Sequence, residues 1–338
     1  MKGDTGYVPA PALDAIRPSW QTIPDGLRDA ITARVGMVVQ AVSPPGGFTP
    51  GLAARLLLSD GGRAFIKALP AGHPFAASYR HEVGAAARIP AGVPAPVLRW
   101  HDEIAGWIVL AFDDAGGRHA DLGPLGRDLP AVLDAVTAVH VPAGGLPQSA
   151  ARIAPWHHGW AQMAAAPPAD LHPWAAEHLE ALAQIERDWV PDAGGATLVH
   201  GDLRADNVLI TDGGAVLVDW AFAGCGAPWL DLAALVPQLI LAGHTPCDAE
   251  QCLARLPAWQ NAPPPAVTSY AVACAGYWTR SSQLPAPADA PHLRGYQARA
   301  GHAAVEWAAR RWGAYQDGYS RRVAGSRPGA GTGVNASP

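Results

Sequence analysis

The chain has 338 residues, of which 49% are hydrophobic and 16% charged, and its formal net charge is −5. This apolar content is enough for one or two buried cores, and the charge excludes the basic surface that nucleic-acid binding needs. Residues 1–20 contain no apolar stretch of signal-peptide length, and the four cysteines lack Cys-x-x-Cys spacing. We therefore expect a folded cytoplasmic protein that binds neither nucleic acid nor a membrane, with its oligomeric state left open.

The first third of the chain alternates strand patterns with two helical patterns. Apolar residues at helical spacing predict helices over 24–35 and 75–89. Runs of β-type residues predict five strands, at 38–42, 52–59, 63–69, 96–101 and 107–112. An Asp-Gly-Gly turn at 60–62 joins the second strand to the third, and a turn at 103–106 joins the last two. These elements predict a small antiparallel sheet accompanied by a helix.

Two charged residues fall on apolar faces of these elements. Alternation along the strand 63–69 places Lys67 on the same face as two apolar residues, and Glu82 lies within the apolar stripe of the helix 75–89. A charge on a buried face needs a partner of opposite sign. We therefore predict an ion pair between Lys67 and Glu82; the alternative is that both side chains point into solvent.

From Leu129 onward the pattern becomes helical. Apolar spacing predicts helices around residues 132–139, 179–189, 232–240 and 305–312, and Pro237 is expected to kink the third. The segment 144–173 is rich in Pro and Trp and has no clear period, so we interpret it as an insert that shapes a binding site. Residues 321–338 are rich in Gly, Ser and Pro, contain few apolar residues and predict a disordered tail.

The stretch 197–232 carries the densest group of polar residues. Two short apolar runs flank a turn at Asp212-Gly213-Gly214, which predicts a β-hairpin. His200 and Asp202 precede the first run, Asn207 follows five residues after Asp202, and Asp219 ends the second run. This spacing is typical of the catalytic loop and metal-binding aspartate of kinase-like phosphotransferases. The alternative is a hairpin with polar ends and no catalytic role.

Through His200–Asn207, Asp219-Trp220 and Trp229–Ala233 the chain resembles the aminoglycoside phosphotransferase family, which has the protein-kinase-like fold. The resemblance implies a two-lobed α+β structure. Residues 1–112 would form an N-lobe with a five-stranded antiparallel sheet and a helix over the nucleotide, and residues 113–320 a larger, mainly helical C-lobe with the catalytic loop, metal site and acceptor site. Gly201 replaces the Arg of protein kinases, and only eleven residues separate Asp219 from Asp231, so no activation-loop switch is expected.

The resemblance also implies catalytic and metal-binding roles in the hairpin region. Asp202 is expected to orient the acceptor hydroxyl and accept its proton. Arg204 is expected to neutralise charge that develops in the reaction, although it has the alternative of pairing with Asp206 or Asp231. Asn207 and Asp219 would supply oxygen ligands to Mg²⁺.

The nucleotide-binding residues implied by the resemblance lie in the first third of the chain. Lys67, held by Glu82, would bind the phosphates of ATP. The glycine-rich loop between the first two strands would cover the phosphates, because glycine lets backbone amides approach closely. Its candidate residues are Gly46, Gly47 and Thr49. Adenine is expected against the segment that connects the lobes, at Leu110, Ala111, Phe112 and Asp113.

The implied activity is an ATP- and Mg²⁺-dependent transfer of phosphate to a hydroxyl of a small molecule, with an aminoglycoside or another antibiotic as candidate and antibiotic resistance as the associated role. Kinases of choline, homoserine and sugar-like alcohols share the same residues, so the acceptor stays open, as does the choice of ATP or GTP. A kinase-like binding protein without turnover is the alternative of another class. The presence of the full set Lys67, Glu82, Asp202, Asn207 and Asp219 argues against it.

The sequence offers two interpretations of the acceptor site. Aminoglycosides are polycations, so their site should be lined by carboxylates. The C-terminal region supplies four candidates, Asp248, Glu250, Asp289 and Glu306. The Trp-rich segment 144–173 equally suits an apolar or sugar-like acceptor.

Overall fold

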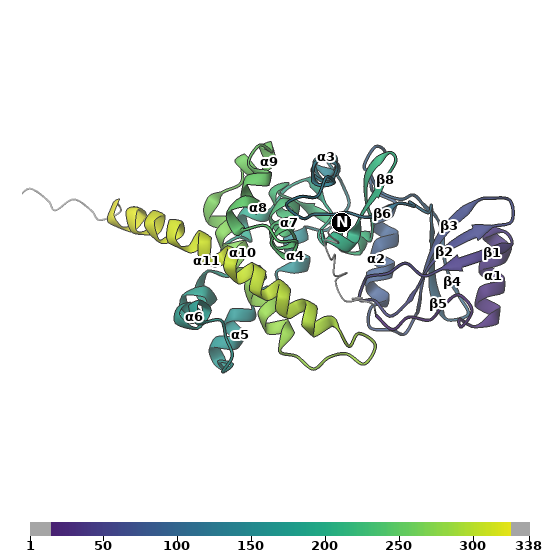
Figure 1. Cartoon of the computed structure of the whole chain (residues 1–338), viewed down its shortest axis with the longest axis horizontal. Coiled ribbons are helices and arrows are strands. Elements are labelled where there is room, and N and C mark those ends of the chain that lie inside the picture. Colours follow the sequence, from purple (N-terminus) through teal and green to yellow (C-terminus); the bar gives the residue numbers. More distant parts are fainter. Residues whose placement is uncertain (1–14, 326–338) are drawn as a thin grey trace, which may run out of the picture.

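The structure, a computed structural model, describes residues 15–325. A strand-rich part at one end of the molecule adjoins a larger, mainly helical part, as Figure 1 shows. This is the predicted α+β arrangement, and we call the two parts the N-lobe and the C-lobe. The expected division at residue 112 coincides with the end of the last strand of the N-lobe sheet, and as a domain boundary it stays a prediction.

The N-lobe contains the predicted five-stranded antiparallel sheet, in the order β1-β2-β3-β5-β4. Its strands are β1 (Val38–Val42), β2 (Leu52–Leu58), β3 (Arg63–Pro70), β4 (Leu98–Ile104) and β5 (Trp107–Phe112). Because side chains alternate along a strand, each face of the sheet carries its own core. Helix α1 (Asp25–Val35) packs on one face through Leu27 and Ile31. Helix α2 (Ala76–Ala86) packs on the other through Ala76 and Tyr79.

Two N-lobe boundaries differ from the sequence expectation. Strand β4 continues to Ile104, three residues beyond its predicted end. Ala105 and Gly106 form the turn with φ values of 50° and 77°, and a two-residue turn with both φ positive lets the flanking strands pair up to its edges. The polar residues at the end of β4 led the prediction to end the strand too early, because such residues are uncommon in strands. Helix α2 is shorter than the expected 75–89.

The C-lobe is built around small β-elements carrying the polar stretch, surrounded by helices. The predicted hairpin is formed by β8 (Val208–Thr211) and β9 (Gly214–Leu217), joined at its edge by β6 (Arg118–His119), and β7 (Thr197–Val199) pairs with β10 (Gly224–Gly226). The α-helices are α3 (Leu129–Val139), α4 (Ser149–Ile153), α5 (Gly159–Ala165), α6 (Pro173–Ile185), α7 (Trp229–Leu241), α8 (Pro246–Leu253), α9 (Pro257–Gln260), α10 (Pro264–Ser282) and α11 (Leu293–Gly325). None of the described helices is long and apolar enough to cross a bilayer.

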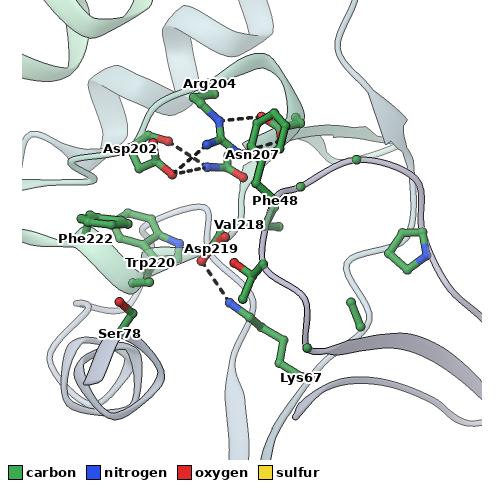
Figure 2. Close-up of a pocket in the computed structure, with 18 of the residues that line it drawn as sticks. Phe48, Lys67, Ser78, Asp202, Arg204, Asn207, Val218, Asp219, Trp220 and Phe222 are labelled. Carbon is green, nitrogen blue, oxygen red and sulfur yellow. Dashed lines mark hydrogen bonds and ion pairs between the residues drawn. The ribbon is translucent and has the colours of Figure 1, made fainter. Parts of the chain in front are cut away.

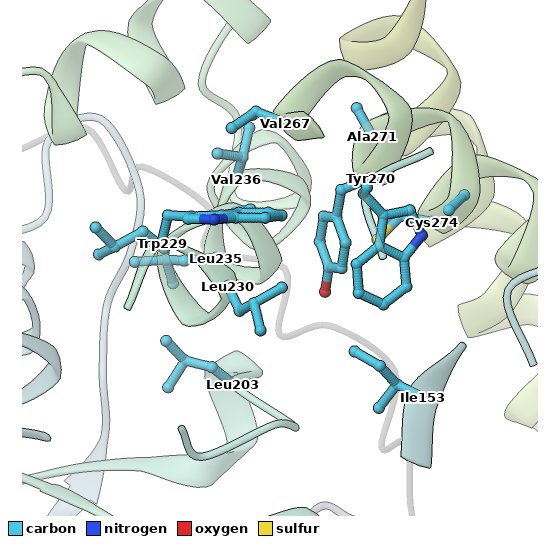
Figure 3. Close-up of a cluster of buried hydrophobic side chains, with 14 of the residues drawn as sticks. Ile153, Leu203, Trp229, Leu230, Leu235, Val236, Val267, Tyr270, Ala271 and Cys274 are labelled. Carbon is cyan, nitrogen blue, oxygen red and sulfur yellow. The ribbon is translucent and has the colours of Figure 1, made fainter. Parts of the chain in front are cut away.

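The main C-lobe core lies directly behind the polar stretch that begins at residue 197 and includes Asp202, Asn207 and Asp219, which we call the catalytic stretch. Trp229 of α7 meets Tyr270 of α10 edge-on, with ring centroids 5.7 Å apart, and Figure 3 shows Leu203 of the catalytic stretch beside this cluster. Helix α7 is continuous through Pro237 and begins at Trp229, earlier than expected. The core therefore holds the catalytic stretch against a rigid helical support.

The Pro- and Trp-rich segment 144–173 is part of the C-lobe core. Helices α4 and α5 form within it, and Trp160 and Met163 are fully buried. The indole Nε1 of Trp160 donates a hydrogen bond to the Val272 carbonyl oxygen of α10, at 2.7 Å. The interpretation of the segment as an insert is therefore corrected, although its exposed Trp156 does line the cleft described below.

Helix α11 also extends beyond its expected range. It reaches Gly325, so the first five residues of the predicted disordered tail 321–338 are helical. The rest of that prediction, residues 326–338, lies outside the described residues.

Candidate active site

A cavity of about 750 Å³ lies between the N-lobe and the C-lobe. It is lined by the glycine-rich loop, by β3 and α2, by the catalytic stretch and by the region where α10 and α11 approach each other. The structure brings most of the sequence-predicted site residues into this one cleft. They are Gly46, Gly47, Thr49, Lys67, Glu82, Phe112, Asp113, Asp202, Arg204, Asn207 and Asp219.

A buried carboxylate shapes the backbone of the catalytic stretch. Asp231, at the start of α7, accepts hydrogen bonds from the amides of His200 and Gly201, at 2.7 and 3.0 Å. Gly201 has φ +78°, and a Cβ there would lie 2.5 Å from the Phe222 carbonyl oxygen. A side chain at position 201 would thus clash with backbone, which gives a steric reason for glycine where protein kinases carry Arg. Through these hydrogen bonds Asp231 braces the backbone at residues 200 and 201.

Asp202 and Asn207 point toward one another in the cleft (Figure 2). The Asn207 side-chain nitrogen Nδ2 donates to the Asp202 carbonyl oxygen at 2.8 Å and to its Oδ2 at 3.2 Å, which leaves the amide oxygen Oδ1 as the atom available to a metal. Burial raises the pKa of Asp202 to about 7, against the opposing attraction of Arg204. A carboxylate with a raised pKa is a better proton acceptor near neutral pH.

Arg204 lies between two carboxylates. Its guanidinium forms a bidentate pair with Asp206, at 2.9 and 2.8 Å, and its Nη1 lies 3.7 Å from Asp202 Oδ2. The pairing with Asp206, one of the two alternatives for this arginine, is thus present. The same guanidinium still faces the cleft, so the expected role in neutralising charge remains compatible with the geometry.

Lys67 is held by two carboxylates from different lobes. Its Nζ lies 2.5 Å from Glu82 Oε2 of α2 and 3.0 Å from Asp219 Oδ1 of the C-lobe. Burial alone would lower the pKa of Lys67, but the attraction of Asp219 and Glu82 outweighs burial and raises it. The predicted Lys67–Glu82 pair is confirmed, and the alternative in which both side chains point into solvent is wrong.

We expect strong coupling between Lys67 and Glu82 in a double-mutant cycle. Removing either residue leaves the other as a buried charge with fewer partners, so Lys67→Ala and Glu82→Ala should be non-additive in ATP affinity and in unfolding free energy, by about 0.5–3 kcal/mol. The exposed pair Arg80–Glu103, 3.3 Å apart, provides a matched cycle that should give only about 0.2–1 kcal/mol. Additivity at Lys67 and Glu82 within about 0.5 kcal/mol would contradict the energetic importance of this pair.

Asp219 adopts a strained backbone conformation. Its φ and ψ are 65° and 69°, the left-handed region that a non-glycine residue occupies at a cost of about 1–3 kcal/mol and that is frequent at functional sites. This conformation turns the carboxylate toward Lys67 in Figure 2. Burial raises the pKa of Asp219, but the charge and hydrogen bond of Lys67, together with the charge of Arg204, outweigh burial and lower it. Asp219 is therefore an ionised oxygen donor facing the cleft.

The donor set fits magnesium rather than a transition metal. Asp219 offers a carboxylate and Asn207 an amide oxygen, the hard ligands that Mg²⁺ accepts. Within residues 15–325 no cluster of three or more His, Cys, Asp or Glu side chains could hold an ion by itself. Mg²⁺ characteristically binds to one or two protein carboxylates and completes its shell with phosphate oxygens and water, which is what these two residues permit.

The glycine-rich loop reaches across the cleft to the catalytic stretch. Gly46 and Gly47 have φ values of 88° and 82°, and a Cβ on Gly46 would lie 3.5 Å from Asp206 Cβ. At the tip of the loop, the Phe48 ring lies 5.1 Å from the Tyr296 ring and 5.2 Å from the Arg204 guanidinium. Sequence reasoning missed Phe48, whose only signal is its position as the lone aromatic residue of the loop.

Residues 15–17 hold the glycine-rich loop in place. The Ala15 amide donates to the Gly47 carbonyl oxygen, and Arg17 Nε donates to the Thr49 carbonyl oxygen, each at 3.0 Å. The Ile16 amide donates to the Asp289 carbonyl oxygen of the C-lobe, at 2.7 Å. This N-terminal segment, which the sequence did not single out, therefore ties the loop to the opposite lobe.

The expected adenine contacts at Leu110 and Ala111 are corrected. Both residues lie within β5, where they pair with β3 on one side and β4 on the other, and their side chains are buried in the two N-lobe cores. Neither lines the cleft, whose wall at this point is formed by Phe112, Asp113 and the two residues that follow. The apolar run ends together with the strand at Phe112, and the expected contacts were placed partly inside that run.

The four carboxylates considered for a polycationic acceptor do not line the cleft. Glu250 accepts hydrogen bonds from Arg311 and Trp307, and Asp248 is bonded to Thr245. Glu306 pairs with His302, while Asp289 contributes its backbone carbonyl to the N-terminal segment. The expectation of an acidic acceptor site built from these residues is therefore wrong.

Comparison with known protein sequences identifies the family of the chain. Residues 51–308 match the sequence profile of the phosphotransferase enzyme family (APH), so the chain belongs to this family, as its catalytic motif predicted. No curated protein sequence matches the chain significantly.

Solved structures share the protein-kinase-like fold. Choline kinase LicA from Streptococcus pneumoniae is 13% identical, with a TM-score of 0.57 over 82% of this chain and 97% of that one. An aminoglycoside phosphotransferase from Alicyclobacillus acidocaldarius is 14% identical, with a TM-score of 0.55 over 83% and 93%. The GDP complex of aminoglycoside 2'-phosphotransferase-IIIa is 14% identical, with a TM-score of 0.53 over 83% and 99%. Identities this low establish the fold alone.

Proposed function

We propose that the protein is an ATP- and Mg²⁺-dependent O-phosphotransferase that moves the γ-phosphate to a hydroxyl group of a small molecule. The observation that carries the proposal is the meeting of Lys67, Asp202, Asn207 and Asp219 in one cleft between two lobes. Membership of the phosphotransferase family supports a kinase-type enzyme. A cytoplasmic location, the setting in which ATP is available, is part of this proposal.

On this proposal the N-lobe binds the nucleotide. The Lys67 ammonium, fixed between Glu82 and Asp219, is poised to neutralise phosphate oxygens, because an ammonium held by two carboxylates cannot swing away. The glycine-rich loop lies over the same space with its backbone close to Asp206, which supports a covering role for Gly46, Gly47 and Thr49. Phe112 and Asp113 then face the adenine.

The C-lobe residues act on the acceptor and on the transferred group. Asn207 and Asp219 would hold Mg²⁺, which would supply positive charge against the phosphate oxygens. Asp202 orients the acceptor hydroxyl and accepts its proton, for which its raised pKa suits it. Arg204, kept in place by Asp206, adds a second positive charge on the catalytic side. Positioning and charge neutralisation of this kind account for most of the catalysis of phosphoryl transfer.

A transfer assay with γ-labelled nucleotide tests the proposal. We expect label to pass from ATP to members of a panel of alcohols and antibiotics in the presence of Mg²⁺ and not in the presence of a chelator, and parallel reactions with GTP identify the donor. Nucleotide binding without transfer to any alcohol would favour the non-catalytic alternative. Failure to bind MgATP at all would refute the proposed function.

A further inference from the structure

The cleft wall beyond the catalytic stretch is aromatic. It is formed by side chains from four separate segments of the C-lobe, which we call the acceptor wall: Trp156, Phe222, Tyr277, Trp278 and Arg294. Phe222 lies beside Asp202 in Figure 2, and Tyr277 is close enough to Asp202 and Arg204 for their charges to act on its pKa, which burial raises to about 12. A molecule that presents a hydroxyl to Asp202 would therefore rest against this wall.

The aromatic rings of the wall form two contacting pairs. Trp156 meets Phe222 edge-on, with centroids 5.5 Å apart, and Tyr277 and Trp278 have centroids 4.7 Å apart. Trp156 is 51% exposed, an unusual degree for the largest apolar side chain, and its exposed surface lines the cleft. Rings fixed in this way offer flat apolar area to a ligand at little entropic cost.

The carboxylates of the cleft are already engaged by basic side chains. Apart from Asp202, every carboxylate that lines the cavity is already in an ion pair within the described chain: Glu82 and Asp219 with Lys67, Asp206 with Arg204, Asp113 with Arg99, and Asp114 with Arg55. Asp202 itself lies 3.7 Å from Arg204. A polycation in this cleft would have to break these pairs to gain partners.

The positive charges near the wall are, by contrast, unpaired. Arg294 donates only to the Pro285 carbonyl oxygen and the Gln297 amide oxygen. Arg152, whose guanidinium lies 5.9 Å from the centre of the Phe222 ring, contacts His81 and the Ala221 carbonyl oxygen. Neither arginine forms an ion pair with a carboxylate among the described residues. The acceptor wall contains Arg294 and no carboxylate, so it carries net positive charge.

From these features we infer that the acceptor is a hydroxyl-bearing molecule with a flat aromatic or polycyclic body and no positive charge. The inference rests on the proposed function and names its substrate class. Stacking on the paired rings binds the body, and the unpaired guanidinium of Arg294 favours a carbonyl, carboxylate or phenolate oxygen at its edge. An aminoglycoside, which is polar over its whole surface and carries several ammonium groups, meets neither condition.

A quaternary ammonium alcohol is the rival that the aromatic rings alone would allow. Aromatic faces attract such cations, but a cage for them combines rings with neutral or negative neighbours. Here Arg294 places a positive charge in the wall itself, and like charges at short range oppose the cation–π attraction. The charge of the wall therefore decides against a cationic ligand.

A charge series on one aromatic body tests the inference directly. The probes are naphthalenemethanol, its carboxylate derivative and its trimethylammonium derivative, with kanamycin as the polycation. Binding to the full chain is measured by calorimetry and by quenching of tryptophan fluorescence, without nucleotide. We expect the neutral and carboxylate probes to bind about tenfold more tightly than the trimethylammonium probe, and kanamycin not to saturate.

Variants assign the binding to the acceptor wall. Arg294→Glu should reverse the order of affinity of the carboxylate and trimethylammonium probes. Arg294→Gln should make the affinities of these two probes similar. Arg299→Glu, an exposed charge inversion on the same helix, should leave the order unchanged. Trp156→Ala should weaken all three naphthalene probes by about two- to tenfold, whereas Leu125→Ala, at an exposed apolar position outside the cleft, should not.

The outcomes separate the inference from the proposed function. Tighter binding of kanamycin or of the trimethylammonium probe, no saturable binding of any probe, or an order unaffected by Arg294→Glu would overturn the inference. Transfer of phosphate to kanamycin would overturn it while supporting the proposed function. Binding in the expected order without transfer from MgATP to any probe would support the ligand class and count against the proposed function.

Discussion

Asp202→Ala is expected to lower turnover by about two to four orders of magnitude and to leave MgATP binding intact, the usual scale for loss of a general base. The side chain lies on the acceptor side of the cleft, and its one side-chain hydrogen bond is accepted from Asn207. Asn207 also donates to the Asp202 main-chain oxygen, which the substitution preserves. The proposed metal ligand should therefore keep its position when the base is removed.

Two further variants make this measurement specific. Asp202→Asn keeps the size and the oxygen that faces Asn207 but loses proton-accepting capacity, so it should be nearly as slow as Asp202→Ala. Asp212→Ala, in the exposed turn of the same hairpin, should retain full turnover. Steady-state transfer and calorimetric MgATP binding are measured in parallel, and near-wild-type turnover of either Asp202 variant would remove this residue from the base role.

Asp219→Ala should abolish the Mg²⁺-dependent part of nucleotide binding. The substitution removes the only carboxylate of the proposed ligand pair and one of the two carboxylates that hold Lys67. Without the Asp219 carboxylate the phosphates would lose the metal, and Lys67 would be anchored by Glu82 alone. Residual binding should come from Lys67 and the glycine-rich loop and should be the same with or without Mg²⁺.

Calorimetric titrations of ATP with Mg²⁺ and with a chelator measure this effect. Asp219→Asn serves as the companion variant, because Asn tolerates the left-handed backbone conformation of this position and keeps one oxygen ligand. It should retain a small response to Mg²⁺ where Asp219→Ala retains none. An MgATP affinity unchanged by Asp219→Ala would contradict the assignment of Asp219 as a metal ligand.

The sequence was most informative where function constrains residues that are close together in the chain. Asp202 and Asn207 lie on one short loop that leads into strand β8, so their spacing is fixed by that loop. The hairpin that follows is predicted by its Asp-Gly-Gly turn. Lys67 and Glu82 were recognisable because a charge on an apolar face has few physical explanations. In each case the signal was local, and the structure confirmed the geometry.

The acceptor wall was not predictable from sequence for a physical reason. Tyr277 and Trp278 lie in the apolar helix α10, where an aromatic residue at helical spacing usually belongs to the core, and Phe222 is separated from them by more than fifty residues. Whether such a ring faces the core or a cleft depends on how the helices pack. The pairing of each acidic residue with a particular arginine or lysine depends on the same packing, so the charge of the site became apparent only in the assembled fold.

The hydrogen bond between Ile16 and the Asp289 carbonyl oxygen has a consequence for how the enzyme opens. Besides the covalent connector after Phe112 and the Lys67–Asp219 ion pair, this N-terminal segment joins the lobes at a further point. Opening of the cleft by rotation about the connector therefore requires this attachment to be released. One backbone hydrogen bond contributes about 0.5–1.5 kcal/mol, which biases the protein toward closure by roughly two- to tenfold. The segment is thus a weak, releasable attachment between the lobes.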